Sequence, residues 1–172
     1  MILDHQPINL LQQFLDNGVL AWALIACGFA QFSKLLIELT IHRRWRPAVL
    51  IETGGMPSSH SALVSGAAAG IGWQQGLDNP LFALAVAVAF VIMYDASGVR
   101  RAAGNIASRV NSFPEEIWGE AVPKPLKESL GHNRFEVLVG GIIGPLIVLI
   151  GLTFAGSPLD IFQSFGWLIK IN

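Results

Sequence analysis

The chain has 172 residues, of which 52% are hydrophobic and only 13% are charged, and its formal net charge is −1. A chain of this composition cannot provide the charged surface of an ordinary water-soluble domain, so that class is excluded. Because the apolar residues fall in blocks long enough to cross a bilayer, we expect one integral membrane domain over residues 1–172. Its fold class is predicted to be all-α, a polytopic bundle of about four to five transmembrane helices with additional interfacial helices. The single cysteine, Cys27, excludes a disulfide framework and a thiolate metal site.

The helices are predicted from the length of each apolar block and from the prolines, glycines and polar residues that end it. Two short amphipathic segments near the chain ends are expected to lie in the membrane interface, and residues 102–131 are expected to be mostly loop. In chain order the predicted elements are an interfacial helix within residues 1–17, spans at Val19–Ile41, Ser61–Trp73 and Leu81–Tyr94, a short helix around Ala102–Val110, a span at Val137–Ala155 and an interfacial helix at Leu159–Ile171.

The second half of the first span carries a polar stripe. Gln31, Lys34, Glu38 and His42 are spaced three, four and four residues apart, which places them on one helical face. Ionisable groups at membrane depth are expensive and usually face a site or a partner inside the bundle. The alternative is that Lys34 and Glu38 merely neutralise each other. We favour a functional role.

The segment 54–62, Gly-Gly-Met-Pro-Ser-Ser-His-Ser-Ala, is predicted to be a loop that leads directly into a helix. Pro57 fixes one backbone angle, while Ser58 and Ser59 are favourable N-cap residues. Free N–H groups, hydroxyls and the imidazole of His60 would gather there, which is a favourable anion site. The alternative is a capped helix with a solvent-facing histidine. Beyond it, Ala62, Gly66 and Gly70 recur every four residues, a spacing that lets another helix backbone approach closely.

His132 and Glu136 are four residues apart at the start of the last span, so they share a helical face. A carboxylate beside an imidazole can hold one ring nitrogen as N–H and leave the other free to attack or to take a proton. Because successive spans alternate in direction, these two residues, segment 54–62 and the polar end of the first span are predicted to converge at one membrane face.

Cationic residues are distributed unequally between the two faces. The positive-inside rule makes the face with the excess cytoplasmic, so the motif face is predicted to be cytoplasmic in a multi-pass protein. The motif face carries Lys34, Arg43, Arg44, Arg46, Arg100, Arg101, Arg109, Lys124, Lys127 and Arg134, and the other face carries only Lys170.

Two histidines, a carboxylate and several cations at a membrane surface favour phosphoryl transfer. One histidine would attack phosphorus and the other would protonate the leaving oxygen. A metal site built from His60, His132, Asp95 and Glu136 is the competing chemical interpretation, but the dense positive charge counts against it.

Three segments carry a family resemblance that covers about residues 31–144. Pro57-Ser58-Ser59-His60 is similar to the central motif of the type-two membrane phosphatidic acid phosphatases, which share their site with vanadium haloperoxidases. Segment 54–62, together with 94–104 (Tyr-Asp-Ala-Ser-Gly-Val-Arg-Arg-Ala-Ala-Gly) and 126–132 (Leu-Lys-Glu-Ser-Leu-Gly-His), resembles the divergent branch of that family, described as acid phosphatase/vanadium-dependent haloperoxidase-related.

The resemblance implies roles for individual residues. His132 would be the nucleophile that forms a phosphohistidine, Glu136 would orient it, and His60 would be the general acid. The main family has a Ser-Arg pair before its nucleophilic histidine, where this chain has Pro125 and Leu126. The predicted phosphate-binding residues are Lys34, Ser58 and Ser59, with Arg100, Arg101 and Lys127 as replacements for the missing arginine, and the supporting residues are Asp95, Gly55 and Glu38.

The leading hypothesis is a membrane-embedded phosphatase that acts on a lipid phosphomonoester or diphosphate, without a cofactor or metal. The alternative is a non-catalytic membrane protein that binds phospholipid or phosphate, as a transporter or an assembly factor. The expected partners are the phosphorylated lipid and the surrounding membrane lipids, and a second copy of the chain could complete the core as a homodimer. No nucleic-acid partner is expected.

Overall fold

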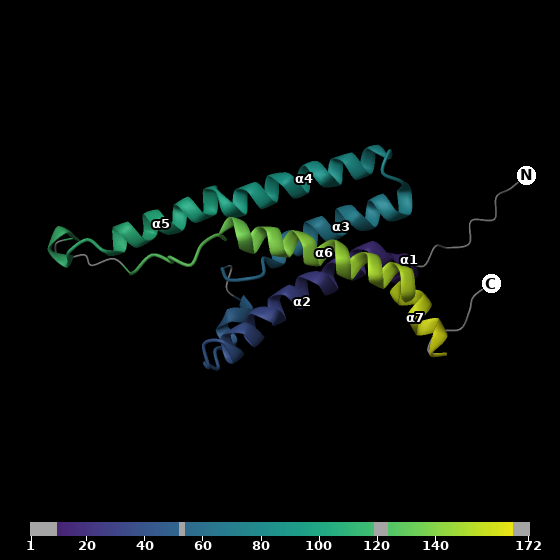
Figure 1. Cartoon of the computed structure of the whole chain (residues 1–172), viewed down its shortest axis with the longest axis horizontal. Helices are drawn as coiled ribbons and strands as arrows, with labels where there is room; N and C mark the ends of the chain where they lie inside the picture. The colour runs from purple at the N-terminus through teal and green to yellow at the C-terminus, as the bar shows by residue number, and fades with distance from the viewer. Residues whose placement is uncertain (1–9, 52–53, 119–123, 167–172) are drawn as a thin grey trace, which may run out of the picture.

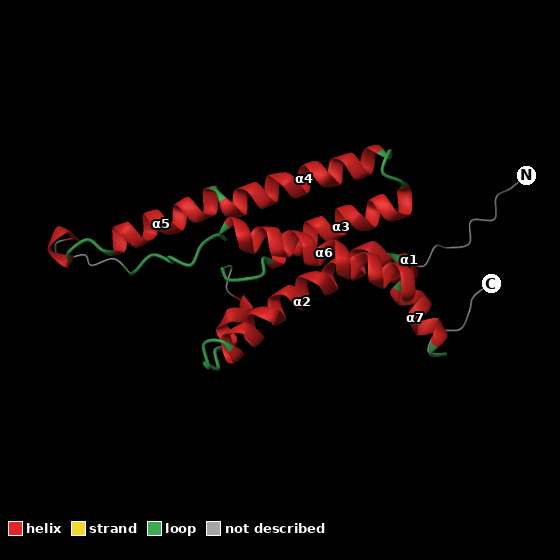
Figure 2. Ribbon diagram, in the orientation of Figure 1, coloured by secondary structure: helices red, strands yellow, loops and turns green. Residues whose placement is uncertain are grey.

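The computed structural model describes residues 10–51, 54–118 and 124–166, and all regular structure in these ranges is helical (Figures 1 and 2). The predicted all-α fold class is therefore confirmed. The outer parts of the two predicted interfacial helices, at 1–9 and 167–172, lie outside the described residues. The elements are α1 (Leu10–Asp16), α2 (Gly18–Thr40), the 3-10 helix η1 (Pro47–Ile51), α3 (Ser59–Gln75), α4 (Pro80–Ser97), α5 (Val99–Asn111), the 3-10 helix η2 (Glu115–Trp118), α6 (Arg134–Phe154) and α7 (Pro158–Ser164).

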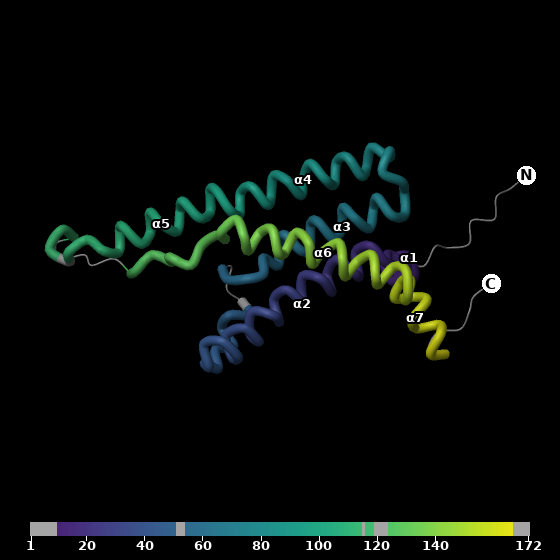
Figure 3. Tube along the Cα trace, in the orientation of Figure 1, coloured from purple at the N-terminus to yellow at the C-terminus, as the bar shows by residue number. Residues whose placement is uncertain are grey.

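Three helical segments in the described part of the chain are long and apolar enough to cross a membrane: α2, the α4–α5 run over 80–111, and α6. The predicted span that begins at Ser61 corresponds to α3, which has 17 residues and does not reach that length. Helix α3 instead lies among the longer helices and packs against α2, α4 and α6 (Figures 1 and 3). The bundle is thus organised around α3, which is shorter than the three helices that it contacts.

The contact between α3 and α6 depends on small residues. A Cβ atom added at Gly144 of α6 would clash with the backbone oxygen of Ala62, and one added at Gly140 would clash with the backbone oxygen of Ser58. On the α3 side, a Cβ on Gly66 would lie 2.8 Å from Val148 and 3.1 Å from the Gly144 oxygen. The close approach predicted from the four-residue repeat of small side chains is therefore confirmed.

Helix α5 continues from α4 after a single break at Gly98 and extends beyond the other helices (Figures 1 and 3). The short helix predicted around Ala102–Val110 is therefore present and somewhat longer. Among the described residues that follow α5 and precede α6, only η2 is helical, as the predicted loop requires. The last part of this segment, residues 126–132, which we call the strap, returns along α5 towards the bundle.

The strap is held on α5 by side-chain hydrogen bonds and by a small-residue contact. Asn111 donates from Nδ2 to the Leu126 oxygen and accepts from the Leu126 N–H, both at 2.8 Å, and its Nδ2 also lies 2.8 Å from Glu128 Oε1. Gly104 lies directly under the strap, where a Cβ atom would come within 2.6 Å of the Glu128 oxygen. At the other end, the His132 N–H donates to the Ala96 oxygen at 2.9 Å. The strap therefore positions His132 against α4.

Replacing Gly144 with alanine tests the α3–α6 contact. The added methyl has no space against Ala62, so G144A should lower the stability by about 1–3 kcal/mol. The matched control is G28A on α2, where an added Cβ meets nothing within 4 Å and should be neutral or stabilising by about 0.5–1 kcal/mol. Thermal unfolding midpoints in detergent compare the two, and an equal effect of both variants would contradict the packing.

Replacing Asn111 with alanine tests the attachment of the strap. N111A removes the acceptor of the Leu126 N–H, so hydrogen exchange at that amide should accelerate, while amides within α6 stay protected. The control is N105A, also on α5, because Asn105 is exposed and has no part in the strap contacts described above. Unchanged exchange at Leu126 in N111A would show that another contact holds the strap.

Candidate functional site

The three segments that carry the family resemblance meet at one end of the bundle. A Cβ on Gly54 would lie 3.7 Å from the backbone oxygens of Ser129 and Gly131, so segment 54–62 borders the strap. Gly131 adopts φ +77°, and its Cα packs against the backbone of Arg100 and Arg101, where a side chain would clash. The predicted convergence of these segments is therefore confirmed by their contacts.

His132 lies at the centre of this meeting point. Its side chain is buried, with 3% of the residue exposed, and its Nδ1 lies 3.0 Å from Glu136 Oε2. An ionised carboxylate at that distance accepts a hydrogen bond, so Nδ1 carries the proton and Nε2 of a neutral ring has a free lone pair. His132 Nε2 is buried and has no hydrogen-bond partner among the described residues.

Glu136 is itself held by a capping box at the start of α6. Its N–H donates to Asn133 Oδ1 at 2.8 Å, and its carboxylate accepts from the Asn133 N–H at 3.2 Å and from Asn133 Nδ2 at 2.7 Å. Asn133 therefore fixes the carboxylate that binds His132. The sequence analysis missed this residue, although Asn followed three positions later by Glu before an apolar run is the capping-box signature.

The surroundings of His132 lower its pKa. Burial is the main cause, since it disfavours the charged imidazolium, and the positive charge of Lys34 acts in the same direction. The hydrogen bond to Glu136 opposes both effects without cancelling them. His132 is therefore neutral at pH 7, the state in which Nε2 can act as a nucleophile or accept a proton.

A small cavity joins the two predicted catalytic histidines. Its volume is about 20 Å³, enough for one water molecule. Arg100 of α5 contributes to its wall, so one predicted phosphate-binding cation lies beside both imidazoles. The lining residues are His60, Ile92, Ala96, Arg100, Gly131 and His132.

Lys34 and Asp95 do not line this cavity but lie near residues that do. Lys34 is buried, and its Cδ lies 3.9 Å from where a Cβ on Gly55 would be, so α2 brings its cation to segment 54–62. Asp95 Oδ2 accepts from Arg100 Nε at 2.5 Å and so holds that guanidinium. Among the described residues, no three His, Cys, Asp or Glu side chains are grouped as ligands of a metal ion.

The other predicted site residues are not in the cavity wall. Ser58 is buried, and its Oγ accepts from the Ser61 N–H at 3.3 Å and from the Ser61 hydroxyl at 2.8 Å, so it caps α3. Its neighbour Ser59 is also buried. Within the predicted polar stripe, Gln31 instead donates to the Leu50 oxygen at 2.6 Å. The predicted roles of Ser58, Ser59, Arg101, Lys127 and Glu38 stay predictions, and the last three are exposed or half-buried outside the cavity.

Comparison with known proteins identifies the family of the chain. The model of the Divergent PAP2 family matches residues 15–147, which include α2, α3, α4, α5, the strap and the start of α6. A Bacillus subtilis (strain 168) protein named "Uncharacterized membrane protein YuiD" is 38% identical over 152 residues, covering 80% of this chain and 96% of that protein. No solved structure matches the chain significantly. By the extent of both matches, the chain is an integral membrane protein that belongs to the Divergent PAP2 family.

Proposed function

We propose that this protein is a membrane-embedded phosphatase that hydrolyses a phosphomonoester or diphosphate on a lipid through a phosphohistidine intermediate. The observation that carries the proposal is the buried His132, with Nδ1 held 3.0 Å from Glu136 and Nε2 left without a partner among the described residues. A neutral imidazole oriented by a carboxylate is suited to nucleophilic catalysis by histidine.

The proposed reaction has two steps. In the first, the Nε2 lone pair of His132 attacks phosphorus, the P–N bond forms, the P–O bond to the lipid breaks, and His60 gives its proton to the leaving oxygen. In the second, His60 takes a proton from water, the water oxygen attacks phosphorus, and the P–N bond breaks to release inorganic phosphate. Glu136 stabilises the positive charge on the His132 ring before the phosphoryl group leaves.

Cations and helix N-termini support binding of the phosphate. Arg100 lines the cavity, Lys34 lies beside Gly55, and α3 and α6 both begin at this end of the bundle. Ten of the 11 Lys and Arg residues belong to the same end by the sequence-based topology. The positive-inside rule therefore supports an active site at the cytoplasmic face, where a lipid phosphate of the inner leaflet would lie.

A second candidate function is phosphate or phospholipid binding without turnover. It is favoured by the departure from the main family before the histidine, because Pro125 and Leu126 stand where that family has its Ser-Arg pair. A site without that arginine would bind phosphate through its other cations but stabilise less of the charge that develops in the transition state. A single assay separates the two candidates.

Phosphate release from a panel of lipid phosphates is the direct test, with H132A beside the unaltered protein in detergent. Loss of the nucleophile should lower the rate on the order of 10³-fold or more. The control is H42A, because His42 is exposed at the end of α2 and does not line the cavity. Equal release by H132A would contradict the phosphohistidine step, and tight lipid binding with no release by the unaltered protein would favour the second candidate.

The pH dependence of E136Q tests the role assigned to Glu136. The pKa of His132 is already below its ordinary value, so the acid limb of the pH–rate profile should lie below about pH 6.5. The hydrogen bond to Glu136 raises that pKa, so its weakening in E136Q should move the acid limb to still lower pH. The rate at the plateau should fall by about 10²–10⁴-fold. A lower rate with an unmoved acid limb would show that Glu136 stabilises the local structure and does not act on the His132 ring.

A further inference from the structure

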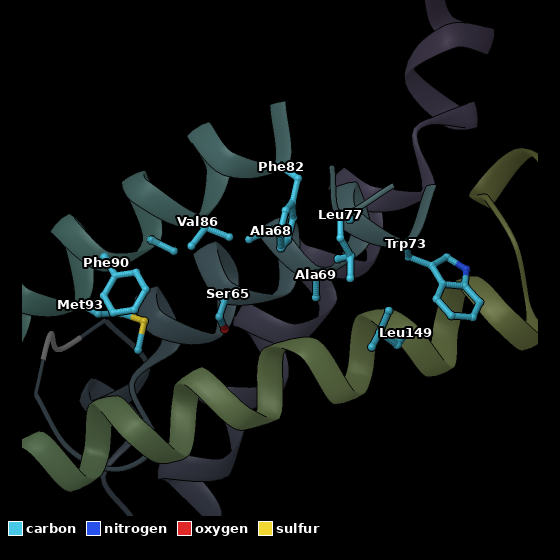
Figure 4. A pocket seen from close by; sticks show the side chains of 12 residues that line it. Ser65, Ala68, Ala69, Trp73, Leu77, Phe82, Val86, Phe90, Met93 and Leu149 are labelled. Atoms are coloured by element: carbon cyan, nitrogen blue, oxygen red, sulfur yellow. The ribbon is translucent and has the colours of Figure 1, made fainter. Parts of the chain in front are cut away.

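A long apolar groove lies between α3, α4 and α6, separate from the small cavity (Figure 4). Its volume is about 560 Å³, within the range of sites for small organic ligands. Small side chains of α3, such as Ser65 and Ala69, form its floor. Val86 and Phe90 of α4 and Leu149 of α6 form its walls.

The groove follows from the way α4 and α6 pack on α3. Near the candidate site the two outer helices meet, since a Cβ on Gly141 of α6 would lie 2.9 Å from Met93 Cε of α4. Further along, α4 instead contacts α3 itself, where a Cβ on Gly72 would lie 2.8 Å from the ring of Phe82. The floor between the outer helices therefore carries small side chains and stays uncovered.

The end of the groove at Met93 adjoins the candidate site. On α4, Ile92 lines the small cavity and Met93 lines the groove. On α3, His60 lines the cavity, and Ser65 begins the groove about 7.5 Å further along the helix. The groove then runs about 12 Å along α3 to Trp73. One leaflet of a bilayer core is about 15 Å thick, so the groove matches most of a leaflet in length.

We propose that this groove binds a hydrocarbon chain of the lipid whose phosphate occupies the histidine cavity. The inference rests on the phosphate-binding part of the proposed function and not on turnover. A phosphate at His60 and Arg100 would place the attached chain at the Met93 end of the groove. The substrate class is therefore a lipid phosphate that is recognised by its chain as well as by its headgroup.

The distribution of charge favours a lipid over an apolar helix of a second copy. Among the helices that line the groove, α3 and α4 carry no Lys or Arg, and α6 carries only Arg134 in its first turn. The cations of the described site therefore lie at the cavity end, as the headgroup of a phospholipid requires.

Photo-crosslinking tests the proposal on the full-length protein in nanodiscs of phosphatidylcholine. The probe is a phosphatidate with a diazirine on one acyl chain, and the reference is a phosphatidylcholine with the same chain. We expect the phosphatidate to form adducts on groove-lining peptides of α3 and α4 at lower concentration than the reference. Filling the groove in V86F should raise the half-saturating concentration about tenfold, equivalent to about two buried methylene groups.

The matched control is V88F on the same helix, because Val88 is exposed and does not line the groove. A69L, which fills the groove from α3, gives an independent second variant. Equal labelling by the two lipids, or equal effects of V86F and V88F, would overturn the proposal, as would phosphate release with no adduct in the groove. Selective labelling without phosphate release would support the groove and contradict only the phosphatase activity.

Discussion

The close backbone approach of α3 to α6 is the constraint on which the site depends. Because glycines on α6 leave room for α3, the Ser58 N–H can donate to the Glu136 oxygen at 3.1 Å. That bond joins the N-cap of α3 to the first turn of α6, so two helix N-termini lie side by side. Each carries about half a positive charge and unsatisfied N–H groups. The packing of apolar helices thus creates the field in which an anion would bind.

The two ring nitrogens of His132 differ in their hydrogen bonding. Buried polar atoms usually have partners, and a missing hydrogen bond costs about 1–3 kcal/mol. His132 Nδ1 meets Glu136, which Asn133 holds in turn, while Nε2 has no partner among the described residues. A buried polar atom retained without a partner is expected where a ligand completes the arrangement. The fixed Nδ1 of His132 and its Nε2, unpartnered in the described part of the chain, are therefore both consistent with a ring that is held in place for a ligand.

The sequence predicted the helices and the convergence of their ends because apolar length, caps and small-residue spacing are local signals. It also paired His132 with Glu136, since a spacing of four on a helix fixes a common face. It did not predict that Asn111 binds Leu126, because side-chain bonds between a helix and an extended strap follow no period. The groove could not be predicted either, since it depends on where α4 and α6 diverge over α3. A serine just before a helix, such as Ser58, can be a helix cap or a phosphate ligand, and the sequence alone does not distinguish the two roles.

The small size of the cavity and the proposed chemistry are reconciled by the unequal restraint of the groups around it. His132 is buried and bonded at both its N–H and its ring, and the strap that carries it is held by Asn111. Arg100 is different, because 53% of its side chain is exposed and its recorded bond is a surface ion pair with Asp95. Such exposed pairs contribute about 0–1 kcal/mol, so the ion pair with Asp95 restrains Arg100 only weakly. Arg100 can therefore exchange the Asp95 carboxylate for a lipid phosphate at small cost, and its movement would enlarge the cavity without disturbing the histidine that must stay fixed.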